Sequence, residues 1–196
     1  MTLPGHYFNI HLNLRRKNTM NTDARKLPPT MDAETLEFIQ GLFALVREGD
    51  TQQLGAMLAQ GVPVNFRNEK GDSLIMLASY HGHLETSRLL LEAGADANVP
   101  NDQGQTPLAG VAYKGYLDIA ELLLKHGAHV EGASPDGKTP LMMAAMFNRL
   151  AILDLLLQHG ARIDAVDSRG MTAVKLAKSM NAQETLARLI SLGQMA

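Results

Sequence analysis

The chain has 196 residues, of which 45% are hydrophobic, 19% charged and 5% aromatic, and it contains no cysteine and no tryptophan. This composition is typical of a folded domain, and the absence of cysteine excludes disulfides, thiolate metal ligands and thiol catalysis. Residues 1–30 carry five Lys or Arg and one Asp, whereas residues 31–196 carry 13 Lys or Arg and 19 Asp or Glu. The acidic body disfavours nucleic-acid binding, which requires a basic surface.

The segment 1–33 lies outside any repeat, and we predict that it forms a disordered tail. The sequence LPPT at 27–30 breaks the chain before the first predicted helix. Translation from Met20 or Met31, and a transit peptide in the segment before the first acidic residue, remain alternatives for this tail. No apolar stretch of about 18 residues and no apolar signal core occurs, so a cytoplasmic protein without membrane contact is expected.

A fixed period is the main feature of the rest of the chain. Two series of glycines follow it: Gly71, Gly104, Gly137 and Gly170, and Gly61, Gly94, Gly127, Gly160 and Gly193. A leucine triplet recurs at the same interval, at 89–91, 122–124 and 155–157. Such a constant interval is the signature of stacked repeats, each of which buries its apolar face against its neighbours.

Each period predicts two helices and a loop. Residues suited to an N-cap begin the first helix, namely Ser73, Thr106, Thr139 and Thr172, and a proline follows two of them at a position where a helix tolerates it. Residues that adopt left-handed backbone angles at low cost then turn the chain into a second helix, namely Gly82, Gly115, Asn148 and Asn181. The second helix carries the leucines and ends at the next glycine. A hairpin-like loop of turn-forming residues leads to the following unit.

Two segments, GQTPLAGVAYKGYLDIAELLLKHGAHV and GKTPLMMAAMFNRLAILDLLLQHGARI, resemble ankyrin repeats throughout. The resemblance covers roughly residues 34–193 and implies a mostly α-helical solenoid of helix-turn-helix pairs linked by hairpin-like loops. It departs from the family after the T-P-L motif, where the family usually has histidine and this chain has Met76, Ala109, Met142 and Lys175. The inter-repeat hydrogen bonds of that histidine are therefore in question.

The resemblance divides the chain into a series of units. They are an N-terminal capping half-repeat at 34–67, repeats at 68–100, 101–133 and 134–166, and a C-terminal capping repeat at 167–196. The first unit lacks a preceding hairpin, and the last helix carries polar residues on its outer side, as terminal repeats require.

A row of large side chains is predicted on one surface, at the end of each first helix. Its members recur at the repeat interval, so stacking aligns them: Tyr80, His81, Tyr113, Lys114, Met146, Phe147 and Met180. Tyr, Met and Phe are enriched in protein interfaces. The row is therefore a candidate binding surface, and the alternative interpretation is that its rings only cover the groove between adjacent first helices.

The loop tips add mixed charges and amides to this candidate surface. They comprise Glu69, Lys70, Asp72, Asp102, Gln103, Gln105, Asp136, Lys138 and Arg169. Such groups set orientation and association rate more than affinity, and the alternative for each is an ordinary solvated charge.

The segment Gly132–Thr139 matches the G-x-x-x-x-G-K-T phosphate-binding pattern. Its register with the other loops, the lack of a preceding hydrophobic strand and the proline that follows it argue against nucleotide binding. His126 and His159 occupy equivalent helix ends that are too far apart to share a zinc ion. No nucleophile and base pattern or carboxylate pair stands out from the periodic background.

The sequence thus predicts a non-catalytic adaptor or inhibitor that binds another protein through its concave face, as the ankyrin resemblance implies. The protein is expected to need no cofactor and no metal, to bind no nucleic acid, and to be monomeric by itself. A targeting or regulatory subunit of an enzyme complex is the alternative function. A nucleotide-binding enzyme that uses Gly132–Thr139 is a remote one.

Overall fold

The computed structural model describes residues 33–193. Within this range the chain forms helices joined by turns, with a single isolated bridge between Arg67 and Ser73 and no strand. The helices are α2 (Ala33–Glu48), α3 (Thr51–Ala59), α4 (Leu74–Tyr80), α5 (Leu84–Glu92), α6 (Pro107–Lys114), α7 (Leu117–Lys125), α8 (Pro140–Met146), α9 (Leu150–Gln158), α10 (Ala173–Ser179) and α11 (Gln183–Gly193). The prediction of a mostly α-helical solenoid is confirmed. The predicted N-terminal tail lies outside the described residues, apart from its last residue, which begins α2.

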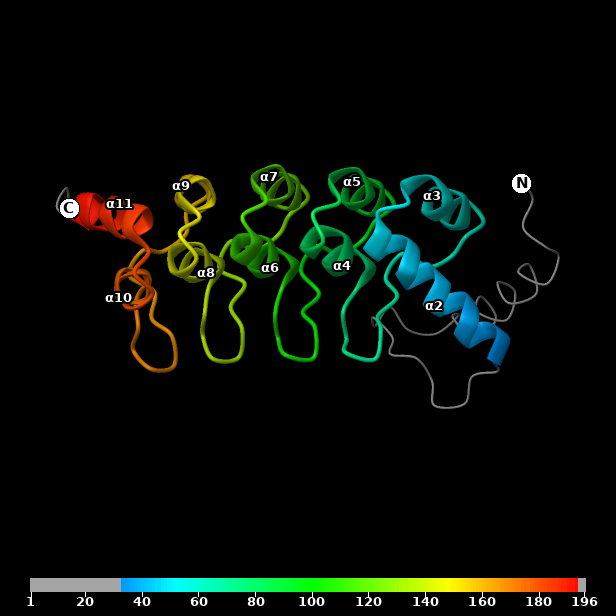
Figure 1. The fold of residues 1–196 in the computed structure, drawn as a ribbon, viewed down its shortest axis with the longest axis horizontal. Coiled ribbons are helices and arrows are strands. Elements are labelled where there is room, and N and C mark those ends of the chain that lie inside the picture. Colours follow the sequence, from blue (N-terminus) through cyan, green and yellow to red (C-terminus); the bar gives the residue numbers. More distant parts are fainter. Residues whose placement is uncertain (1–32, 194–196) are drawn as a thin grey trace.

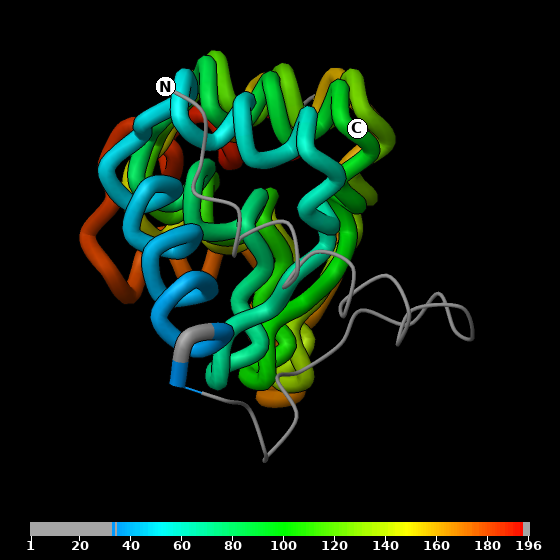
Figure 2. Tube along the Cα trace, turned by 90° about the vertical axis from the view of Figure 1, so that its right-hand side faces the viewer, coloured from blue at the N-terminus to red at the C-terminus, as the bar shows by residue number. Residues whose placement is uncertain are grey.

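The helices form two rows along the length of the molecule (Figure 1). The first helices α2, α4, α6, α8 and α10 make one row, the second helices α3, α5, α7, α9 and α11 make the other, and the loops project beyond the first row. Viewed along the stack in Figure 2, the loops of successive units lie behind one another. Residues one period apart in sequence therefore occupy the same edge of the molecule.

The residues predicted to start and turn the helices do so. The side chains of Ser73, Thr106, Thr139 and Thr172 each accept a hydrogen bond from the backbone N–H three residues later, which satisfies one of the free donors at a helix start. At the turn between helices, Gly115 has φ +94° and Asn148 has φ +55°. Each unit thus reverses direction at a residue that tolerates the left-handed region.

The loops repeat one turn that the sequence does not make obvious. The Oδ1 atom of Asn101 accepts hydrogen bonds from the N–H groups of Gln103 and Gln105, at 3.1 and 3.0 Å. Asn68 and Asp167 occupy the same place in their own loops and hold them in the same way. These side-chain oxygens accept hydrogen bonds from backbone N–H groups of the loop. The tips of these three loops therefore have the same shape.

The core is continuous from α2 to α11 and consists mainly of aliphatic side chains. Ile75, Leu108 and Leu141 occupy the same position in three units and are each 1% exposed. Burial of such a side chain contributes about 1.5–3 kcal/mol before the entropy of ordering the chain is counted. Stacking of neighbouring units is therefore what stabilises the short helices.

Hydrogen bonds between units come from a position other than the one after T-P-L. Asn98 accepts from the N–H of His129 at 2.7 Å and donates from Nδ2 to the carbonyl of Gly127 at 2.9 Å. Asn65 and Glu131 accept the equivalent backbone N–H of the next unit. Met76, Ala109 and Met142, the residues after the T-P-L position, are buried. The hydrogen bonds of Asn65, Asn98 and Glu131 therefore link adjacent units in place of those side chains.

Gly193 departs from the glycine series to which its spacing assigns it. Gly94, Gly127 and Gly160 have φ between +84° and +89° and follow their helices, whereas Gly193 is the last residue of α11 and has no positive φ. A left-handed residue serves to turn the chain toward a following unit. Within the described residues, no further helix follows Gly193.

Candidate protein-binding groove

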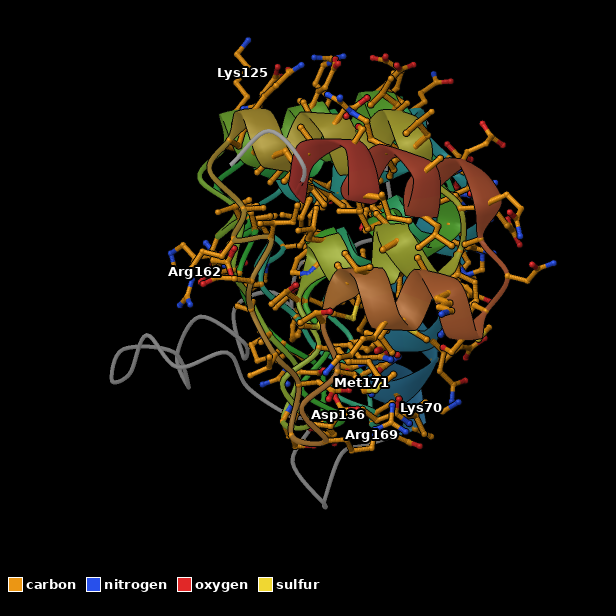
Figure 3. All side chains as sticks on the ribbon, turned by 90° about the vertical axis from the view of Figure 1, so that its left-hand side faces the viewer. Lys70, Lys125, Asp136, Arg162, Arg169 and Met171 are labelled. Carbon is orange, nitrogen blue, oxygen red and sulfur yellow. The ribbon has the colours of Figure 1, made fainter. Side chains whose placement is uncertain are left out.

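A groove of about 920 Å³ runs along the first helices and the loops. It contains residues of three successive units, and eleven of the side chains predicted for binding line it: Lys70, Asp72, Tyr80, His81, Asp102, Gln103, Gln105, Tyr113, Asp136, Lys138 and Phe147. Figure 3 shows Lys70 and Asp136 at the loop edge of the molecule, with Lys125 at the opposite edge. Stacking therefore gathers on one face residues that are far apart in the sequence.

Three rings form a row in this groove. Tyr80 and Tyr113 are nearly parallel, with ring centroids 6.3 Å apart and an interplanar angle of 7°. Phe147 meets Tyr113 edge to face at 4.5 Å and 84°. Both arrangements are favourable for aromatic pairs. The rings therefore stabilise one another. Tyr80 nevertheless remains 38% exposed, so the row presents apolar surface to a ligand in the groove.

Cations cluster where the first helices α2, α4 and α6 end. The Lys114 ammonium lies 4.8 Å from the centroid of the Tyr80 ring, a cation–π distance. The rings of His81 and His83 stack at 6.2 Å, and His83 Nε2 lies 2.7 Å from the carbonyl oxygen of Arg47. Burial, followed by the charges of His83, Arg47 and Lys114, lowers the pKa of His81.

Three carboxylates of the loop tips already have partners. Asp102 lies 3.7 Å from the guanidinium of Arg67, and Asp136 forms an ion pair with Lys138. The hydrogen bonds from Lys138 and Ser134 lower the pKa of Asp136 to about 2. Asp72 accepts from the side-chain amide of Asn101 at 3.0 Å.

Five predicted binding residues do not line this groove. Lys114 and Met180 lie at helix ends, and Met180 is 48% exposed. Met146 packs against the core. Arg169 binds the carboxylate of Asp167, which lies within its own loop. Glu69 lines a smaller pocket of about 370 Å³ next to α2.

Several lining residues were missed by the sequence analysis. Met76, Ala109 and Met143 face the groove, and each precedes a ring of the row by four residues. Residues four apart lie on the same face of a helix. The helical period, read back from Tyr80, Tyr113 and Phe147, could have identified them.

The segment Gly132–Thr139 has the geometry of the other loops. No strand precedes it in the described chain, Gly137 has φ +80° like the glycines in register with it, and Lys138 is engaged with Asp136. A phosphate-binding loop joins a strand to a helix and keeps its lysine available for phosphate. The match to that pattern therefore arises from the repeat.

Two kinds of feature are absent from residues 33–193. No three His, Asp or Glu side chains in this range come together as a group that could hold a metal ion. No helix in the same range has both the length and the apolar character needed to cross a membrane.

Comparison with known proteins identifies the fold. A family model described as ankyrin repeats in three copies matches residues 42–134 and 130–195. The chain belongs to the ankyrin-repeat family. It is also 59% identical over 61 residues to a Pseudomonas aeruginosa protein named as an ankyrin repeat protein, in a match that covers 31% of this chain and 36% of that relative. The chain thus spans about a third of the length of the curated relative it matches.

Ankyrin repeats are protein-interaction modules, and the family is generally non-enzymatic. The shape of an ankyrin stack does not by itself identify a ligand. What distinguishes one member from another is the set of side chains in and beside the groove. In this chain the ring row and the paired loop carboxylates line the groove, and the cations at the helix ends lie beside it.

Proposed function

We propose that this ankyrin-repeat protein is a non-catalytic adaptor or inhibitor that binds a partner protein in the groove between its first helices and loops. The observation that carries the proposal is the row of Tyr80, Tyr113 and Phe147, which places three large rings side by side on an open surface. Aromatic anchors dominate the energy of protein interfaces because they bury much area at a small entropic cost.

The groove is open and long, which supports binding of a macromolecule. It is lined by residues of three units, which belong to the first helices and to the loop tips. The loop tips supply amide groups such as Gln103 and Gln105 at its edge. An interface with an apolar centre and a polar rim has this organisation.

The test is a triple variant, Tyr80→Ala with Tyr113→Ala and Phe147→Ala, in a titration against a partner identified by affinity purification. We expect the helical circular dichroism to persist and the affinity to fall about a hundredfold or more, which corresponds to about 3 kcal/mol. The matched control changes Glu92, Lys125 and Gln158 to Ala. These residues repeat at the same spacing on exposed positions of the second helices.

Unchanged affinity of the folded triple variant would reject the groove as the binding site. Equal losses in the triple variant and in the control would also reject it, because they would show that the partner recognises the stack as a whole or its outer surface.

A further inference from the structure

Two arginines lack the ion pairs that the other described arginines form: Arg47 in the last turn of α2, and Arg149 between α8 and α9. Ion pairs with Asp or Glu side chains engage Arg67, Arg88, Arg162, Arg169 and Arg188. Among the side chains that the structure describes, Arg47 and Arg149 have no such pair, and both are exposed. Lys114, which lies over the Tyr80 ring, also has no carboxylate partner there. The charges of these three residues are therefore available to a ligand.

These cations lie at one side of the ring row. Arg149 donates from Nε to the carbonyl of Tyr113 at 3.1 Å, which places it at the end of α6, the helix that also carries Lys114. His83 is held against the carbonyl of Arg47 at the end of α2. Cations thus follow the helix ends across three units, beside the rings.

His81 lies among basic side chains at this side of the groove. Its ring stacks on that of His83 at 6.2 Å, and Lys114 lies over the ring of the preceding residue, Tyr80. Burial lowers the pKa of His81, and His83, Arg47 and Lys114 lower it further.

The carboxylates on the opposite side of the groove are engaged by other groups of this chain. Asp136 is paired with Lys138 and Asp102 with Arg67, and Asp72 accepts from the side-chain amides of two asparagines. The net attraction available to a ligand therefore comes from the cations at the helix ends, and complementarity requires a ligand with negative charge on that side.

Building on the proposed function, we propose that the partner segment in the groove is an acidic polypeptide. Its apolar side chains pack on Tyr80, Tyr113 and Phe147, and its carboxylates face Arg47, Lys114 and Arg149. A peptide can direct apolar and acidic side chains to different sides because alternate positions of a strand, or different faces of a helix, point in different directions.

Two other occupants fit less well. The chain's own residues 1–30 carry five Lys or Arg and one Asp, so they match the cationic side poorly. A nucleic acid carries negative charge along its whole backbone, and would also bring phosphates toward Asp72 at the loop edge, whose partners are neutral amides.

The test selects peptides from a random display library on the immobilised full-length chain and measures binding of the synthesised hits. We expect the selected peptides to contain more Asp and Glu than the unselected library, next to aromatic or aliphatic residues. The double variant Arg47→Gln, Lys114→Gln should bind such a peptide at least tenfold more weakly in low salt. The difference should shrink at about 1 M salt, where charges are screened within about 3 Å.

The matched control is the double variant Lys125→Gln, Arg162→Gln, which removes the same charge from residues that do not line the groove. Figure 3 shows Lys125 at the edge opposite Lys70 and Asp136. It should bind the selected peptides as the unchanged chain does. Arg149 is left in place because it also makes the hydrogen bond to Tyr113. An equal loss in both double variants would overturn the assignment, since only the total charge would then matter.

The remaining outcomes separate this inference from the proposed function. Selected peptides that lose binding in the triple aromatic variant but are neutral or basic would overturn the acidic assignment and leave the groove as the binding site. Failure to select any peptide whose binding depends on the rings would count against both the acidic assignment and the proposed function. Tight binding of a single-stranded DNA oligonucleotide that the Arg47→Gln, Lys114→Gln variant loses would overturn the peptide assignment in favour of a nucleic acid.

Discussion

The ring of Pro135 lies against Gly104, in the space that a Cβ atom at Gly104 would need. This contact replaces a hydrogen bond that occurs at the neighbouring junctions between loops. The N–H of Asp102 donates to the carbonyl of Lys70 at 3.0 Å, and the N–H of Ser168 donates to the carbonyl of Asp136 at 2.9 Å. Pro135 occupies the equivalent position and has no N–H. Close packing on a glycine therefore joins the two middle loops.

Gly104→Ala should destabilise the protein more than Gly170→Ala. Both glycines occupy the same position of the loop, with φ +73° and +70°, but a Cβ atom at Gly170 would meet nothing within 4 Å. Gly170→Ala should therefore lower the free energy of unfolding only by the cost of a left-handed alanine, about 1–2 kcal/mol. Gly104→Ala should lower it by about 1–3 kcal/mol more, because the added Cβ clashes with Pro135. Urea unfolding measures both values, and equal losses would contradict the packing argument.

Ser87→Ala should stabilise the protein. Ser87 is a buried residue of α5. Its hydroxyl has no hydrogen-bond partner among the described residues. Removing such a group should raise the free energy of unfolding by about 1 kcal/mol. Ala120 holds the same position in α7 and provides the reverse test, because Ala120→Ser should lower that free energy. Thermal unfolding of both variants checks the prediction, and a lower melting temperature for Ser87→Ala would refute it.

Asn148→Gly should loosen α11 although glycine suits the turn better. Asn148 has φ +55°, and its Oδ1 atom also accepts from the N–H groups of Glu184 and Thr185, at 3.0 and 3.1 Å. It thus supplies a cap to the helix of the next unit, and its loss should cost about 1 kcal/mol. Hydrogen exchange at Glu184 and Thr185 should accelerate.

Asn181→Gly is the matched control for this variant. Asn181 has φ +56°, and its Oδ1 atom accepts from the side chain of Gln183 rather than from a backbone N–H. Glycine there should leave the stability unchanged or slightly increased, because the turn is kept and no backbone cap is lost. A similar loss in both variants would show that the turn, and not the cap, explains the effect.

Asp136 should make the protein sensitive to acid in a defined range of pH. Its pKa falls from the usual 3.8 to about 2 in the folded chain. The folded state therefore binds fewer protons than the unfolded state between these values, and stability that is present above pH 3.8 is lost as the pH falls toward 2.

The variant Asp136→Asn should flatten the stability profile in this range, and Ser134→Ala, which removes one of the two hydrogen bonds to the carboxylate, should flatten it partly. Unfolding measured at several pH values between 4 and 2 provides the test. A profile for Asp136→Asn as steep as that of the unchanged chain would refute the assignment.

The backbone of this fold could be predicted because each turn requires particular residue types. A left-handed residue is cheap only for glycine or asparagine, so Gly115 and Asn148 mark their turns in the sequence. N-caps such as Thr106 are equally specific. Gly193 shows the limit: its spacing fits the series, but it is the last residue of α11 and has no positive φ.

The groove could be predicted only in part. The spacing predicted that Tyr80 and Tyr113 would align, and they stack. It could not separate Met146 from Phe147, because α8 ends at Met146 and the direction of Phe147 depends on the backbone angles of the cap. The pairing of Asp102 with Arg67 requires the distance between two loops, which no local pattern contains.

In a periodic stack, the backbone alone cannot fix the position of a bound partner along the repeats. A partner shifted by one repeat would meet nearly the same backbone. The side chains can fix that position: the two parallel rings of Tyr80 and Tyr113 are followed by the edge-on ring of Phe147, and the order does not repeat. A partner that matches this sequence of orientations would lose contacts in any slipped position.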